Sequence, residues 1–362
     1  MARLSWHARF GIGSPAGIVC AVVLAALPPA PRASSYVGGL AGAYLRPPVG
    51  ATAAAMGGAQ SADPRYLASW WNPAAFGVYR SNRVAMGLGY RALGRTEGYA
   101  SCGLYIPPRV GAGVTVLYRG DPYITGLVDE AEEELDPGSY TTVTAKVALG
   151  YYLTRRISAG INLGVFYQNM TAYYDESGGV DNETAFSIGN IDAAVRVELR
   201  KDLTASLLLR NLSVPGDTSS QWQFGDWGAQ SEAGTYAPTV TGAVSYTTSL
   251  LGRPFLYNSD ITVYAFDYRF RGLPRTSAVF SNGVEWQGWD TFYLRGGIGD
   301  ITVDSDLLGD TQRYGRGFSM RVTAGCMIEL SNVREGMRLN YNIATNKTLA
   351  GVNQQIDVVY EF

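Results

Sequence analysis

The sequence predicts an all-β protein, a transmembrane antiparallel β-barrel of about 14 strands with an N-terminal plug inside the lumen. Apolar and polar residues alternate along segments of about 10 to 14 residues. Strands of globular proteins centre near 5 or 6 residues, whereas membrane-barrel strands need about 9 to 11. The apolar faces of these segments lack charges, as expected where a lipid-facing charge costs roughly 2 to 4 kcal/mol. No window after the N-terminus offers 18 consecutive apolar residues, which excludes a helical membrane protein.

The segment "RISAGINLGVFYQ" illustrates the alternation. Ile157, Ile161 and Leu163 share one face, and Asn162 and Gln168 lie on the other. A secreted soluble β-protein would alternate in the same way, so strand length and charge placement are what favour the membrane barrel.

Fourteen such segments can be counted, an even number as a closed bacterial barrel requires. They lie at 82–92, 97–106, 110–119, 140–153, 156–169, 184–199, 202–213, 237–249, 259–270, 277–288, 291–300, 317–331, 336–347 and 352–362. Tight turns such as "PPR" and "RKD" alternate with long polar connections, which predicts that the short turns and the N-terminus are periplasmic. The connection Leu250–Ser259 is too long for a periplasmic turn, so a miscounted strand there stays open.

Residues 1–35 are predicted to be a cleaved signal peptide, because basic residues precede the apolar run Ala16–Leu27 and small residues follow it. The run is too short to span a bilayer as a helix, which needs about 20 residues, although a retained anchor is the alternative. Cleavage removes three of the 29 basic residues and none of the 31 acidic ones, so no nucleic-acid partner is expected. It also removes His7, the only histidine.

We predict no enzyme activity, no catalytic residue, no metal site and no cofactor. General-base catalysis at neutral pH most often uses histidine, and the mature chain contains none. The acidic cluster Asp129–Asp136 is either a cation or cargo site or, as we favour, a solvated turn, since it lacks the glycine of a calcium loop. The loop aromatics Trp222, Phe224 and Trp227 are a landing site for an apolar ligand or partner protein, part of an interfacial girdle, or residues that pack on the barrel mouth.

Charged residues recur on the faces predicted to point into the lumen. They either mark a substrate path or, as we favour, pair with each other and with plug carbonyls. These lumen-facing candidates are Arg196, Arg210, Glu285, Arg295, Arg321 and Arg338.

The segment "IDVVYEF" ends on an aromatic residue, and its apolar face predicts an assembly signal for outer-membrane barrels. That face consists of Ile356, Val358, Tyr360 and Phe362. The expected partners are therefore outer-membrane lipid and the barrel assembly machinery, with bacterial outer-membrane localisation.

Residues 36–80 do not alternate, and we assign them to a plug inside a barrel formed by residues 81–362. Fourteen strands enclose a lumen too wide for side chains alone to fill. The strings "GATAAAMGGAQSA" and "WWNPAAFG" resemble the N-terminal signature of the FadL-like outer-membrane proteins, most closely of the PorV/PorQ group. The plug motif comprises Met56, Gly57, Gly58, Ala59, Trp70, Trp71, Asn72, Pro73 and Ala74.

The resemblance implies one of two functions. PorV-type proteins serve the type IX secretion system and bind exported cargo, whereas FadL-type proteins take up hydrophobic compounds. The strings favour the first, so we expect a non-catalytic barrel in protein secretion, with secretion-system proteins or secreted cargo as partners. The alternative is FadL-like transport of fatty acids or aromatics, with a hydrophobic small molecule as the ligand. A general porin is the third reading, which the plug argues against.

Overall fold

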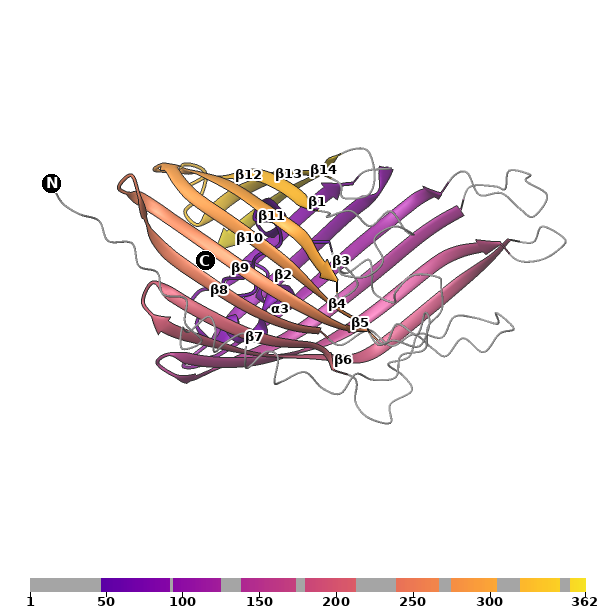
Figure 1. The fold of residues 1–362 in the computed structure, drawn as a ribbon, viewed down its shortest axis with the longest axis horizontal. Helices are drawn as coiled ribbons and strands as arrows, with labels where there is room; N and C mark the ends of the chain where they lie inside the picture. The colour runs from indigo at the N-terminus through magenta and orange to yellow at the C-terminus, as the bar shows by residue number, and fades with distance from the viewer. Residues whose placement is uncertain are drawn as a thin grey trace.

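The fold is a closed antiparallel barrel in which every strand pairs with its neighbours along the chain and β1 pairs with β14 (Figure 1). The computed structural model describes residues 47–91, 94–124, 138–173, 180–212, 239–266, 275–304, 320–345 and 352–362. The strands are β1 (Arg83–Tyr90), β2 (Thr96–Ile106), β3 (Val110–Ile124), β4 (Gly138–Thr154), β5 (Ile157–Tyr173), β6 (Val180–Arg200), β7 (Leu203–Leu212), β8 (Thr239–Leu250), β9 (Arg253–Phe266), β10 (Arg275–Trp289), β11 (Phe292–Asp304), β12 (Arg321–Glu329), β13 (Met337–Thr345) and β14 (Val352–Glu361). The predicted fold class is confirmed.

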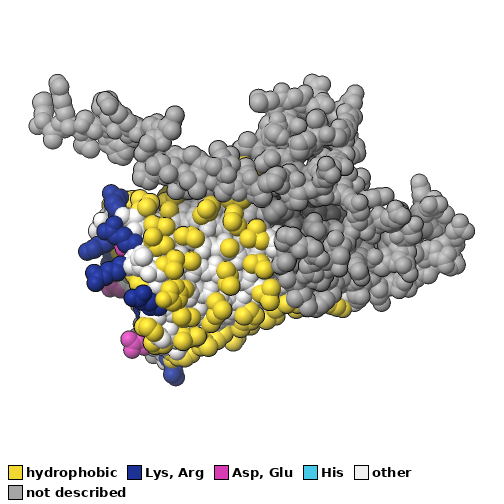
Figure 2. Space-filling view, turned by 90° about the horizontal axis from the view of Figure 1, so that it is seen from below, with side chains coloured by type: hydrophobic (Ala, Val, Ile, Leu, Met, Phe, Trp, Pro, Cys, Tyr) yellow, Lys and Arg dark blue, Asp and Glu magenta, His cyan; other side chains and the backbone are white. Residues whose placement is uncertain are grey.

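Side-chain alternation decides which face of each strand points outward. Leu88, Ile161 and Val147 are 70%, 56% and 55% exposed, whereas Thr115 and Asn162 are buried inside. One face of the molecule carries a hydrophobic band, with Lys and Arg side chains gathered at one end (Figure 2). Among the described residues, no helix is long and apolar enough to cross a bilayer.

The expected long connection at Leu250–Ser259 is wrong. β8 ends at Leu250 and β9 begins at Arg253, so Leu251 and Gly252 alone form the turn. Both residues have positive φ, 53° and 73°, as a two-residue hairpin of type I′ requires. Pro254 obscured the strand start, although proline is tolerated near the first position of a strand. The strand count is unaffected.

Several expected features lie outside the described residues. These are the signal peptide 1–35, residues 36–46 of the predicted plug, the acidic cluster 129–136 and the loop aromatics 222–227.

The chain before the barrel, residues 47–80, lies inside the lumen and is called the lumenal segment below. It contains α2 (Ala51–Ala55), α3 (Ala68–Trp71) and the 3-10 helix η2 (Pro73–Gly77). α2 packs on β11 to β14 and η2 packs on β2 to β6, so the segment reaches across the barrel from one wall to the other.

α2 is a short run of alanines that ends in the glycine pair of the motif. Gly57 has φ 69°, and Gly58 N donates to Ala53 O at 2.8 Å. This is the left-handed cap of a Schellman motif, which satisfies carbonyls at the helix end. The strings that alternate least thus form local turns rather than strands.

Candidate functional site

The site is the interface between the lumenal segment and the inner wall of the barrel. Two parts of the wall hold the segment. We call the wall of β10 to β14 around residues 51–59 the α2 seat, and the wall of β3 to β7 around residues 72–77 the η2 seat.

In the α2 seat, glycines of the wall meet the backbone of the segment. A Cβ atom added to Gly297 would lie 2.4 Å from Gly57 N, and one added to Gly283 would lie 2.5 Å from Met56 Cβ. Met56 and Gly57 are themselves fully or almost fully buried. No side chain fits between wall and segment at these positions, which brings the two backbones into direct contact.

Wall side chains satisfy the polar groups at both ends of α2. Asp357 Oδ2 accepts from Ala51 N at 2.7 Å. At the other end, Thr323 Oγ1 accepts from Gly57 N at 3.1 Å and donates to Ala55 O at 2.7 Å. At its start α2 is capped by the barrel, since Gly50 offers no side chain, and at its end Thr323 adds to the cap made by Gly57 and Gly58.

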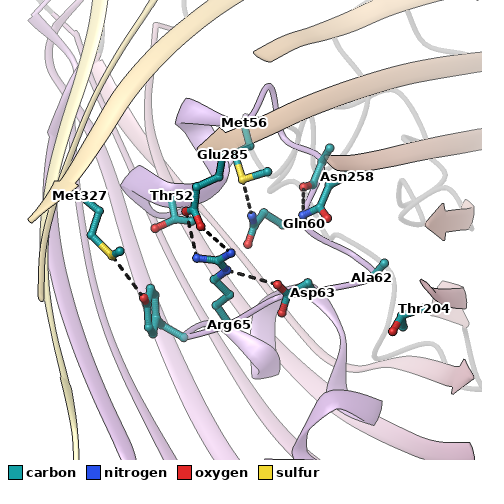
Figure 3. Close-up of polar contacts among 12 residues, drawn as sticks. Thr52, Met56, Gln60, Ala62, Asp63, Arg65, Thr204, Asn258, Glu285 and Met327 are labelled. Carbon is teal, nitrogen blue, oxygen red and sulfur yellow. Dashed lines mark hydrogen bonds and ion pairs between the residues drawn. The ribbon is translucent and has the colours of Figure 1, made fainter. Parts of the chain in front are cut away.

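Glu285 joins a cation of the segment to a cation of the wall, and Figure 3 shows its contact with the segment cation, Arg65. It lies 2.8 Å from Arg65 and 2.6 Å from Arg295. Arg295 also donates to Thr52 Oγ1 at 3.1 Å. Burial opposes the charge of Arg65, but the carboxylates of Glu285 and Asp63 raise the pKa of Arg65 well above its ordinary value. Such charge-assisted bonds are about twice as strong as neutral ones, so this cluster ties the segment firmly to β10 and β11.

The chain that follows α2 is held by β9. Asp260 Oδ2 accepts from Gln60 N at 3.1 Å and from Ser61 N at 2.9 Å. Asn258 Nδ2 donates to Ala59 O at 3.1 Å (Figure 3). Two consecutive amides and a carbonyl of the segment thus bond to one strand.

In the η2 seat, Asn72 connects three pieces of chain. Its Oδ1 accepts from Ala74 N at 3.0 Å, which caps η2, and Pro73 occupies the first helical position. Its Nδ2 donates to Ser61 O at 2.6 Å and to Ser206 Oγ at 3.1 Å. The Asn-Pro pair is therefore a fully bonded, buried turn at the wall.

Glycines of β3 to β5 let η2 approach the wall closely, as glycines of β11 do for Gly57. A Cβ atom at Gly160 would lie 2.4 Å from Ala74 N, and one at Gly150 would lie 2.4 Å from Pro73 O. The Phe76 ring fills the space above Gly113, where an added Cβ would come within 2.2 Å of it.

Trp70 and Trp71 are buried between the two seats, 4% and 8% exposed. They belong to an apolar cluster with Val49, Leu67, Ala53, Ala85, Tyr99, Leu117 and Val359. Trp71 Nε1 donates to Val49 O at 3.1 Å, and the ammonium of Lys146 lies 5.1 Å from the centre of the Trp70 ring. The tryptophans fill volume that strand side chains do not reach.

All six lumen-facing candidates contact the lumenal segment. Besides Glu285 and Arg295, Arg196 donates to Ala62 O at 3.4 Å and Arg210 to Trp71 O at 2.7 Å. Arg321 donates to Gly57 O at 3.3 Å, and Arg338 to Tyr66 Oη at 3.3 Å. This geometry places them as anchors of the segment.

Sequence reasoning missed Asn258, because the start of β9 was placed at residue 259, and it left Asp260 unassigned although this residue lies inside the predicted strand. It also left Asp357 and Thr323 unassigned, although both lie on the polar faces of their strands. Polar residues at every second position of a barrel strand were the signal that could have found them.

The predicted assembly signal lies on the outer face of β14. Ile356 and Phe362 are 46% and 56% exposed, and the rings of Tyr360 and Phe362 stack with centroids 5.3 Å apart. Backbone bonds between Phe362 and Asn82 extend the closure of the barrel.

Three comparisons place this fold among known proteins. The sequence matches no protein-family model and no curated protein. Among solved structures, the Ralstonia pickettii toluene transporter TbuX is 12% identical, with a TM-score of 0.56 over 87% of this chain and 97% of that one. The Pseudomonas putida toluene transporter TodX is 13% identical, with a TM-score of 0.55 over 87% and 97%. A Pseudomonas aeruginosa FadL homologue is 9% identical, with a TM-score of 0.57 over 87% and 98%.

The chain therefore has the fold of the FadL-type outer-membrane transporters. These neighbours are transporters and not enzymes. The expected role in type IX protein secretion is contradicted, because the solved structures that share this fold are toluene transporters and a FadL homologue. Short strings rich in Gly and Ala had favoured secretion over hydrophobic uptake. In the structure these strings form helix caps and close wall contacts, which carry no cargo specificity.

Proposed function

We propose that this chain is an outer-membrane barrel that takes up hydrophobic compounds, with its short turns and N-terminal side facing the periplasm. The observation that carries the proposal is the fold, which matches toluene transporters over 87% of the chain. The FadL-like motif strings agree with it. The PorV/PorQ closeness of those strings stays a proposal about ancestry and implies no export role.

We further propose that the lumenal segment acts as a plug. Its helices are buried against walls on opposite sides of the barrel, and buried charges bind it there. A solute that crosses the lumen must therefore displace part of the segment or pass beside it. This arrangement also supports a selective transporter over a general porin.

Whole-cell uptake tests the proposal. Cells lacking the gene, and the same cells with the gene restored, are supplied with radiolabelled toluene, a medium-chain fatty acid or, as the hydrophilic control, a disaccharide. Restoration is expected to raise uptake of a hydrophobic compound severalfold and to leave disaccharide uptake unchanged. Equal hydrophobic uptake with and without the gene would sink the transport proposal, and a parallel rise for the disaccharide would indicate a general porin.

The plug is tested by deletion. Purified protein lacking residues 36–80 is expected to show a much larger conductance in planar bilayers than the full mature chain, once circular dichroism has shown that the barrel is folded. Low and unchanged conductance would reject the plug. Barrel assembly machinery and membrane lipid remain the predicted partners.

A further inference from the structure

An apolar groove runs along the outer wall over β3 to β7, on the face that meets the membrane. Its volume is about 580 Å³. The outward-facing side chains at its centre, Ala159 and Ala193, are small, and larger residues such as Tyr151, Ile161 and Val195 stand around them. Those three are 45%, 56% and 43% exposed. A lipid-facing groove without polar lining suits a hydrocarbon chain.

Unpaired cations lie at the short-turn end of this groove. Arg109 immediately precedes the lining residue Val110, and Arg155 and Arg156 form the β4–β5 turn. Ala159 is three residues beyond Arg156, about 10 Å along an extended strand. All three arginines are exposed, and none of their side chains has an ion-pair or hydrogen-bond partner among the residues the structure describes.

Other arginines at this rim have partners. Arg200 lies 3.1 Å from Asp202, Arg253 pairs with Asp290, and Arg334 donates to Tyr360 Oη at 2.7 Å. Among the arginines at the described part of this rim, the ones without a side-chain partner are thus the three at the end of the groove. Clusters of arginine next to a membrane surface attract anionic lipid headgroups, and guanidinium groups bind phosphate in a bidentate fashion.

We propose that this part of the outer wall is a binding site for an anionic phospholipid. One acyl chain occupies the groove over Ala159 and Ala193, and the headgroup phosphate lies on Arg109, Arg155 and Arg156. The apolar groove determines the position of the chain, and the arginines select phosphatidylglycerol over a zwitterionic lipid with the same chains.

Native mass spectrometry of the full mature protein in detergent tests the site. The protein is mixed with equimolar phosphatidylglycerol and phosphatidylcholine of identical acyl composition, and retained lipid is counted. The unmodified protein is expected to retain phosphatidylglycerol at least about fivefold over phosphatidylcholine. Equal retention of the two lipids overturns the proposal.

Two variants separate headgroup from chain. The first is a triple variant, which should bring the ratio of retained phosphatidylglycerol to phosphatidylcholine close to one; it combines Arg109→Gln, Arg155→Gln and Arg156→Gln. Its control is a second triple variant with the same change in charge, which should keep the preference; it combines Arg200→Gln, Arg253→Gln and Arg334→Gln. Ala193→Leu fills the groove and is expected to reduce retention of both lipids. The matched change Ala324→Leu, at an exposed position on β12, leaves retention unchanged.

Circular dichroism first establishes that each variant retains the β-barrel spectrum. An equal loss of preference in both arginine triples means diffuse surface charge and overturns the site. Preferential retention of lipid A in a direct competition with phosphatidylglycerol also contradicts the proposal.

Discussion

Wall glycines let the backbone of the lumenal segment lie against the barrel in both seats, but the side chains that complete the contact differ. In the α2 seat, charged side chains from the wall, Asp357, Arg295 and Arg321, bond to the helix or to residues beside it. In the η2 seat, glycines of β3 to β5 let the backbone of residues 73–77 lie directly on the wall, and the neutral side chain of Asn72 completes the contact.

This difference indicates which half of the segment can move. Water and ions can replace the hydrogen bonds of the α2 seat when the segment leaves, because an exchanged hydrogen bond to a charged group contributes a net of only about 1.5 to 3 kcal/mol. Close packing against wall glycines is present in both seats, but residues 72–77 are also joined to β1 within a few residues, so the chain itself restrains them. We therefore expect residues 51–59 to be the displaceable half and residues 72–77 to stay in place during transport.

The largest effect is expected from filling the η2 seat. In Gly160→Val, the new Cβ would lie 2.4 Å from Ala74 N. The atom it meets belongs to the backbone, which cannot move aside as a flexible side chain could. We expect a loss of about 3 kcal/mol in the free energy of unfolding, measured by urea titration in detergent. Gly296→Val is the control, because its Cβ would meet nothing closer than 3.9 Å and the expected change is within about 0.5 kcal/mol. Equal losses in the two variants would show that the close approach of η2 has no energetic weight.

A smaller effect is expected at the turn itself. Asn72→Ala removes the cap of η2 and leaves Ser61 O without its donor, which should cost about 2 kcal/mol in the same titration. Asn72→Ser keeps a capping hydroxyl but cannot reach all three partners. The serine variant should therefore lose about half as much free energy of unfolding as the alanine variant. An alanine variant as stable as the native protein would mean that the turn is only a connection.

The smallest effect is expected in the α2 seat, and it is local. Asp357→Ala removes the acceptor of Ala51 N and should speed hydrogen exchange of the amides of Ala54, Met56 and Gly58 about tenfold, equivalent to about 1.4 kcal/mol. Amides of residues 75–79 should exchange as before. Asp202→Ala, which breaks an exposed pair, is the control. Faster exchange in both seats would mean that the segment opens as a single unit.

Periodicity of two predicted the barrel well, because a strand with lipid on one side and polar groups on the other must alternate at every position. The same rule identified Arg295 and Arg321 as inward-facing. It could not identify their partners, since alternation gives the face of a strand and not the depth at which the lumenal segment crosses it. The pairing of Glu285 with Arg65 depends on the path of a segment that has no periodicity.

The glycines also divide into those that the sequence alone explains and those that only the three-dimensional structure explains. Gly57 and Gly58 were singled out from their motif, and helix capping explains them. Gly160 and Gly297 look like ordinary small residues of barrel strands, and only the approach of a distant backbone distinguishes them from Gly296. Function was harder still, because the strings that suggested secretion encode local geometry.

The contact between Ala51 and Asp357 also has a consequence for biogenesis. α2 leaves the ribosome before every strand of the barrel, whereas β14, which carries its carboxylate partner, is translated after all other strands. The Ala51 amide therefore lacks its acceptor while the first thirteen strands are synthesised. The same strand, β14, pairs with β1 to close the barrel and carries the acceptor for Ala51 N. Closure of the barrel and docking of α2 against its inner wall thus both depend on the addition of β14, a late event in the maturation of the protein.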